Sequence, residues 1–264
     1  MPVQKCPLCL ETKQVISSHL MPAGLYDYTS GPDGDHVSFN AEIMMATTRQ
    51  LQHPLLCQAC EENLNKNGEN WMVPLFARYG GSFLFHDLLT KMPPAIVDGE
   101  TRVFAAARNP DINTDMLTHF AMGIFWKAAV HSWSGSETAP LIDLGPYTES
   151  VRQYLRGETG FPARMALMIG VLPPPVKNIS FSGPYRGANG EWHNFVLYIL
   201  GIEFMLFVGK AVGREQRDAS FSGNPERPIL LFDFSAEMQA VGRKVMQGTK
   251  KARNVEKYLK ERTT

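Results

Sequence analysis

The longest helical pattern of apolar positions runs from Met116 to Val130. Apolar residues occupy most faces of this segment, and the preceding Asn113-Thr114-Asp115 offers favourable N-cap side chains. We therefore expect a central, largely buried helix here. A second and more amphipathic helix is expected from Tyr147 to Arg156.

Beyond Pro173-Pro174-Pro175 the pattern favours strands. Runs of apolar and aromatic residues occur at 179–181, 192–200, 203–208 and 229–234, with turn signals at Asn189-Gly190 and Gly201. Aromatic and aliphatic residues alternate between Trp192 and Phe207, which favours a sheet core over a base-stacking surface. A basic helix is expected from Ala236 to Arg262.

Before residue 75 the predicted elements are short. Val15 to His19 is expected to form the second strand of a hairpin, and Ala41 to Gln52 a short helix. Thr29 to Asp35 is rich in turn-forming residues. Another helix is expected to begin near Glu61.

The four cysteines of the chain form two Cys-x-x-Cys pairs, Cys6/Cys9 and Cys57/Cys60, separated by 47 residues. Each pair allows two thiolates to reach one ion, and two pairs complete a tetrahedral four-sulfur zinc site. Two disulfides are the alternative, which a reducing compartment disfavours. The spacing therefore predicts one structural Zn²⁺.

Composition is that of an ordinary globular protein, with 264 residues, 44% hydrophobic and 20% charged. We expect an α+β fold with a zinc module at 1–75 and a larger α+β region at 76–264. The start of the sequence lacks a secretory pattern, so a cytoplasmic location is expected. The apolar run 195–208 is too short for a membrane helix and contains Glu203, so no membrane association is expected.

Charge is distributed unevenly although the net charge is zero. Residues 1–75 contain four basic and eight acidic side chains, a net charge of −4, whereas residues 243–262 contain eight basic and two acidic side chains, a net charge of +6. DNA or RNA, if bound, would therefore contact the basic C-terminal helix. A solvated helix face is the alternative explanation for that charge.

Between the cysteine pairs lies Ser17-Ser18-His19-Leu20-Met21-Pro22, and the second pair follows Leu55-Leu56. In this order the first quarter of the chain resembles the zinc-stapled HNH endonucleases of the ββα-metal class, in a Ser-His-x-x-Pro variant known from bacterial and phage proteins. The resemblance implies a treble-clef module, hydrolysis of nucleic-acid phosphodiesters, and a role in phage defence or in a mobile element.

The resemblance also implies roles for individual residues. His19 matches the general base that takes a proton from water, and a divalent ion, Mg²⁺ or Mn²⁺, stabilises the phosphate. The chain departs from the family at Ser18, which replaces the metal-binding aspartate, and at Gln52, which lies near the position of the asparagine that orients the histidine. The ion would then need Glu61, Asn63 or Asn65 as ligands.

Other interpretations of these residues remain open. His19 could simply order its loop, His36 or His53 could replace it, and Glu61 could serve only as an acidic residue in the first turn of a helix. A non-catalytic, zinc-stapled binding protein derived from the HNH fold is then the alternative function. No segment predicts base reading, so a protein partner could supply recognition.

Overall fold

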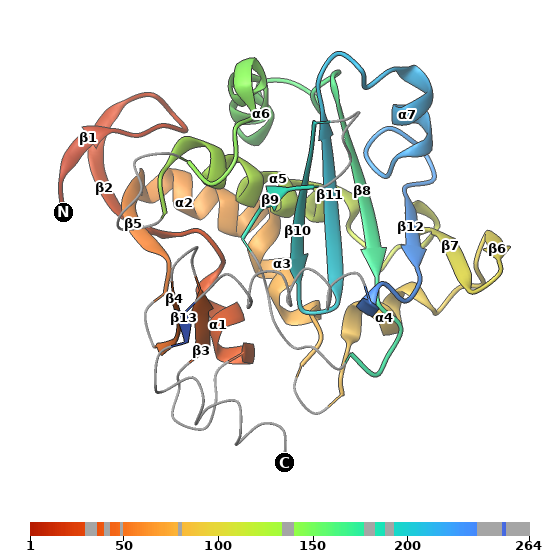
Figure 1. Ribbon diagram of the computed structural model, residues 1–264. Helices are drawn as coiled ribbons and strands as arrows, with labels where there is room; N and C mark the ends of the chain where they lie inside the picture. The colour runs from red at the N-terminus through yellow and green to blue at the C-terminus, as the bar shows by residue number, and fades with distance from the viewer. Residues whose placement is uncertain are drawn as a thin grey trace.

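The computed structural model describes residues 1–29, 36–39, 43–47, 50–78, 81–133, 140–176, 183–187, 193–236 and 250–251. The fold is mixed α+β, as predicted (Figure 1). The four cysteines lie close together in space. The division at residue 75 stays a prediction. Buried side chains from Cys6 to Leu231 belong to one continuous apolar core.

The N-terminal strands form a small antiparallel sheet in the order β1-β2-β5, with β1 at Val3–Lys5, β2 at Thr12–His19 and β5 at Gln52–Cys57. The predicted hairpin strand ending at His19 is confirmed. A register shift between Ile16 and Ser17 interrupts the β2–β5 ladder. After β2, Pro22 leads into helix α1 at Ala23–Thr29.

A helical run follows β5 without a break in helical backbone. Helix α2 spans Gln58–Leu64, a π-helical turn spans Asn65–Glu69, and helix α3 spans Asn70–Met72, followed by a 3-10 turn at Val73–Leu75. The expected helix after the second cysteine pair is therefore confirmed, and it begins three residues earlier than Glu61.

The helix predicted from Ala41 to Gln52 is wrong. Ile43–Thr47 forms strand β4, which pairs antiparallel with β3 at His36–Phe39. Helix-favouring Met and Ala residues are present, but tertiary strand pairing overrides propensity, and β-branched Ile43 and Thr47 favour the strand. Most of the turn-rich stretch before β3 lies outside the described residues.

The two predicted helices of the larger region are confirmed. Helix α5 spans Thr114–Val130, and the Asn113 side chain caps it by accepting a hydrogen bond from the Met116 N–H at 3.0 Å. Helix α6 spans Thr148–Leu155. Two short helices were not predicted, α4 at Leu84–Leu89 and α7 at Arg214–Ala219.

A seven-stranded sheet forms the larger region, in the order β6-β7-β12-β8-β11-β10-β9. Its strands are β6 (Ile96–Asp98), β7 (Thr101–Ala105), β8 (Met165–Val171), β9 (Tyr185–Arg186), β10 (His193–Ile199), β11 (Ile202–Val208) and β12 (Pro228–Leu231). The predicted β10–β11 hairpin turns at Leu200 and Gly201, both at positive φ, as a two-residue hairpin turn requires. The segments 179–181 and 189–190 lie outside the described residues.

The predicted basic helix from Ala236 to Arg262 is interrupted where the structure describes it. Lys250–Lys251 forms strand β13, which pairs parallel with β4. The remaining residues of that prediction, apart from Ala236, lie outside the described range. The backbone N–H and C=O groups of these two lysines can thus pair with the edge of β4 and need no hydrogen bonds within a helix.

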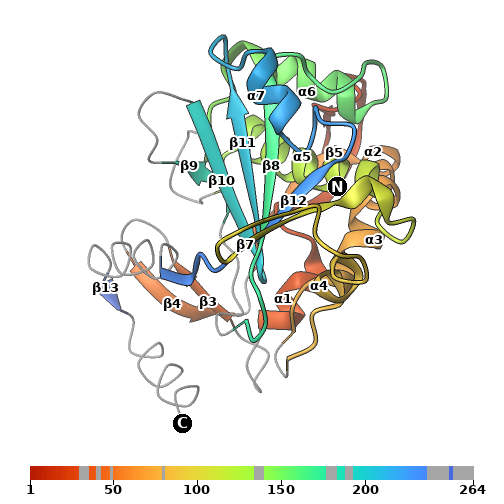
Figure 2. The same cartoon turned by 90° about the vertical axis from the view of Figure 1, so that its right-hand side faces the viewer.

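Helix α5 connects the two regions. The Phe120 ring of α5 lies 6.0 Å from the Phe204 ring of β11 and 5.6 Å from the Phe76 ring, which follows the helical run. Figure 2 shows α2 and α3 on the same side of the sheet as α5. Among the described residues, no helix is long and apolar enough to cross a membrane.

Candidate metal centre and adjoining cavity

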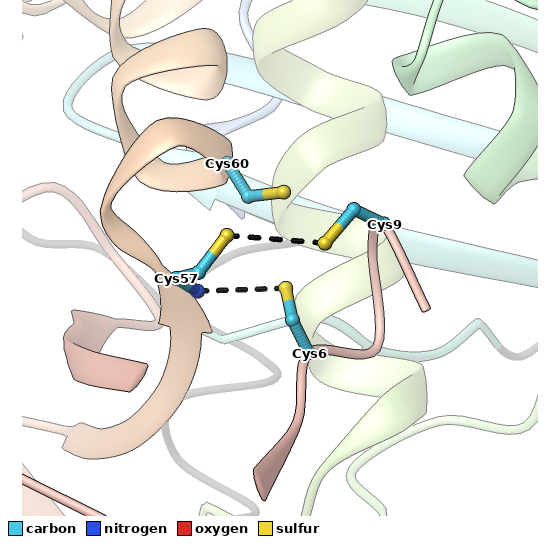
Figure 3. A group of neighbouring side chains, drawn as sticks. All are labelled: Cys6, Cys9, Cys57 and Cys60. Carbon is cyan, nitrogen blue, oxygen red and sulfur yellow. Dashed lines mark hydrogen bonds between the residues drawn. The ribbon is translucent and has the colours of Figure 1, made fainter. Parts of the chain in front are cut away.

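The four cysteines converge from two parts of the chain (Figure 3). Their sulfur atoms all lie within 4.8 Å of one another, and Sγ of Cys9 lies 3.9 Å from Sγ of Cys57. Ligand sulfurs at about 2.3 Å from a tetrahedral zinc ion are about 3.8 Å apart. The cysteine cluster could therefore hold a zinc ion with little rearrangement.

Local structure favours the thiolate form of Cys6, whereas burial raises the pKa of Cys9 and hydrogen bonding with Cys6 raises that of Cys60. Cys57 is the N-cap residue of α2, and its backbone N–H donates to Sγ of Cys6 at 3.4 Å. A side-chain hydrogen bond with Cys60 is the largest cause that lowers the pKa of Cys6 to about 4, against burial, which raises it. Thiolate is the form that binds zinc.

Arg152 ties the first cysteine pair to helix α6. Its Nη1 donates to the Leu8 carbonyl oxygen at 2.9 Å, while Nη2 contacts the carboxylates of Glu149 at 2.8 Å and Glu158 at 3.0 Å. Hydrogen bonding to Glu149 raises the pKa of Arg152. The loop that carries Cys6 and Cys9 is thus anchored to the larger region.

A cavity of about 420 Å³ adjoins the cysteine centre. Its wall combines the end of β2, the start of α1 and one side of the helical run, and its polar lining residues include His19, Glu61, Asn65, Glu69 and Asn70. The structure therefore brings His19 together with two of the three predicted ion ligands.

His19 is half-buried at the end of β2. Burial and the nearby charge of Lys127 lower the pKa of its imidazole, and a hydrogen bond with the Gln50 side chain opposes this shift. A lowered pKa keeps the imidazole neutral near pH 7, the form that accepts a proton. The glutamine that hydrogen-bonds His19 is therefore Gln50 and not Gln52.

Gln52 itself is exposed, and its Oε1 accepts from the Ser17 hydroxyl at 3.1 Å. It lies directly opposite His19 in the β2–β5 ladder. Its side chain does not line the cavity.

Glu61 lies in the first turn of α2 with its carboxylate largely out of solvent. Burial raises the pKa of this carboxyl, whereas Lys127 and a hydrogen bond from the Ser18 hydroxyl lower it. Its Oε2 atom is buried and has no hydrogen-bond partner among the described residues. A buried, unpaired carboxylate oxygen is costly, and a cation or bound water at the cavity would relieve that cost.

Ser18 does not face the cavity. The side chain is fully buried, and its Oγ accepts from the Leu56 N–H at 3.2 Å. Ser18 therefore hydrogen-bonds the Leu56 N–H and the Glu61 carboxylate and does not line the cavity.

The helical run separates Asn63 from Asn65. Asn65 lines the cavity, whereas Nδ2 of Asn63 donates to the Leu155 carbonyl oxygen at 3.0 Å and its Oδ1 accepts from Asn67. Asn63 borders a different cavity of about 490 Å³ beside α6. Asn63 is thus misplaced as a partner of His19.

The other predicted histidines lie elsewhere. The imidazole of His53 lies against that of His131, with ring centroids 4.1 Å apart and the ring planes tilted by 36°, and neither residue lines the cavity. The side chain of His36 lies outside what the structure describes.

Sequence reasoning missed an ion pair behind the cavity. Lys127 of α5 has a side chain only 1% exposed, and its Nζ lies 3.1 Å from Oε1 of Glu69, whose side chain is 15% exposed. Charged side chains are almost never fully buried without a partner. Lys127 sits in an otherwise apolar helix pattern, and that isolated charge was the available signal.

Among the described residues, the cysteines are the one group of three or more His, Cys, Asp and Glu side chains whose ligand atoms all lie within 4.8 Å. His19, Glu61 and Glu69 line one cavity but do not form such a group.

Comparison of the chain with protein-family models, curated proteins and solved structures gives no match.

Proposed function

We propose that this protein is a metal-dependent endonuclease of the HNH type, which hydrolyses phosphodiester bonds of DNA or RNA. The observation that carries the proposal is the cavity in which β2 presents His19 while α2 presents Glu61 and the π-turn presents Asn65. The HNH resemblance implies two strands and a following helix held together by a four-cysteine centre of treble-clef type. Strands β2 and β5 and helix α2 fit that arrangement.

The oxygen donors of the cavity fit a hard divalent ion. Glu61 offers a carboxylate whose Oε2 has no partner among the described residues, and Asn65 offers an amide oxygen. When bound, Mg²⁺ or Mn²⁺ would offset the charge that develops on a phosphate.

The remaining chemistry belongs to protein side chains. Neutral His19 takes a proton from the attacking water, and Gln50 fixes the orientation of the imidazole ring. Ser18 holds the Glu61 carboxylate toward the cavity through its hydroxyl. Lys127 lies close enough to lower the pKa of both His19 and Glu61, so it favours a neutral base beside an ionised ligand.

A cleavage assay with a matched histidine variant tests the proposal. Supercoiled plasmid and structured RNA are incubated with zinc-loaded protein and Mg²⁺ or Mn²⁺. Because a general base contributes about 10²- to 10⁴-fold, His19→Ala should lower the cleavage rate at least about a hundredfold. The control His53→Ala changes an exposed histidine on the adjacent strand and should cleave normally.

Equal cleavage by wild type and His19→Ala would contradict the proposal. Binding of nucleic acid without cleavage would favour the non-catalytic, zinc-stapled binding protein, because the buried Ser18 leaves this chain without the aspartate of the family.

A further inference from the structure

The buried ion pair behind the cavity is an unexpected feature of the fold. Lys127 is fully buried, and its ammonium group forms an ion pair with the Glu69 carboxylate. A buried ion pair often contributes nothing to stability compared with apolar residues of the same volume. Such a pair in the wall of a polar cavity therefore invites a functional explanation.

The ion pair leaves part of Glu69 available. Lys127 contacts Oε1 of Glu69, and the Glu69 side chain also lines the cavity that contains His19 and Glu61. Glu69 therefore places a carboxylate charge in the same cavity lining as His19 and Glu61. Glu69 is thus an electrostatic partner of the cavity residues and not merely a counter-ion for Lys127.

The π-turn places Glu69 on the same side as Glu61. Four residues of an α-helix overshoot one full turn by about 40°. The π-turn at Asn65–Glu69 has more residues per turn, so each residue rotates less about the helix axis. Glu69 therefore stays closer to the side of the helix that Asn65 occupies. Glu61, Asn65 and Glu69 consequently share one wall of the cavity.

Resting on the proposed function, we infer that Glu69 is a further ion-binding residue of this cavity, acting on the divalent cation directly or through a coordinated water. Glu61 and Glu69 place two partly buried carboxylates in one cavity wall, and a divalent cation bound there would offset the repulsion between their charges. The Lys127 ammonium neutralises part of the charge of Glu69, so the site suits one divalent ion.

Calorimetric titration of the zinc-loaded full chain with Mn²⁺ tests this inference without any cleavage. Glu69→Gln should weaken Mn²⁺ binding at least tenfold. Glu62→Gln, an exposed acid on the same helical run that contacts Gln58 at 2.7 Å, is the matched control and should bind like wild type.

The double variant Glu69→Gln/Lys127→Met separates ligand binding from folding. It removes both charges of the buried pair, so its melting temperature should exceed that of Glu69→Gln alone, while its Mn²⁺ affinity should stay at least tenfold below wild type. Wild-type Mn²⁺ affinity in the double variant would overturn the inference, as would a wild-type protein that binds no Mn²⁺. Loss of Mn²⁺ binding in Glu69→Gln together with a wild-type protein that cleaves nothing would leave the inference standing and reject only the nuclease activity.

Discussion

Ser18 illustrates how a single buried hydroxyl can change the reading of a motif. The resemblance places an ion ligand at this position, whereas the fold turns the side chain inward to the Leu56 N–H and the Glu61 carboxylate. A neighbouring residue on the opposite face of the strand, Ser17, is exposed and lines the cavity. Alternation along a strand decides which of two adjacent serines meets solvent.

The substitution Ser18→Asp should therefore lower the stability of the fold and should not raise the affinity for a divalent ion. The new carboxylate would be buried beside Glu61, and an unpaired buried charge costs about 3 kcal/mol or more. Denaturant unfolding measures the loss. Ser17→Asp is the control and should unfold near the wild-type midpoint; a Ser18→Asp protein of unchanged stability would show that the side chain can turn to the cavity.

At the scale of elements, the close approach of α5 to the helical run positions Lys127 beside Glu69. Gly68 makes this possible. A Cβ atom added there would lie 2.8 Å from the Phe120 backbone nitrogen and 2.9 Å from its Cα. Since backbone atoms cannot rotate away, any larger residue must push the helices apart.

We predict that Gly68→Ala destabilises the protein by about 1–2 kcal/mol, because overpacking outweighs the higher helix propensity of alanine. The free energy of unfolding from urea denaturation measures this change. Gly160→Ala, at a site with nothing within 4 Å of the added carbon, should unfold like wild type. Equal stability of the two variants would mean that α5 and the π-turn can separate without cost.

Much of this element structure was predictable from patterns, and the exceptions have physical causes. The helix around Met116 to Val130 is a long apolar run that follows a capping asparagine, and the β10–β11 hairpin is two strand-forming runs joined at a glycine. Strand β8 was missed, since a strand buried on both faces shows no alternation. The π-turn at Asn65–Glu69 packs against α5 through Gly68, a tertiary contact that a sequence pattern does not encode.

The site could be predicted only in part for the same reason. The cysteine spacing predicted the four-cysteine cluster, because ligand spacing within a pair is a local property. The Lys127–Glu69 pair joins residues 58 positions apart, so only the folded chain reveals it.

At the scale of the whole molecule, the cysteine centre joins the N-terminal loop to α2. Metal-replete protein should contain one zinc per chain, since four sulfurs close the coordination shell. Cys57→Ser should lose zinc and melt at a lower temperature, as measured by elemental analysis and thermal unfolding. Gln58→Ala, at an exposed neighbouring position, should keep both properties; a zinc-free wild type or an unchanged melting temperature for Cys57→Ser would refute a structural zinc.

Hydrolysis of bis(p-nitrophenyl) phosphate tests the central claim most directly, because this small phosphodiester needs neither base recognition nor a protein partner. With Mn²⁺, the release of p-nitrophenolate should be faster with wild type and His53→Ala than with no protein, and it should fall to the protein-free rate with His19→Ala and Glu61→Gln. An equal, Mn²⁺-dependent rate in wild type and His19→Ala, or no rate above the protein-free control in wild type, would contradict a phosphodiesterase centred on His19.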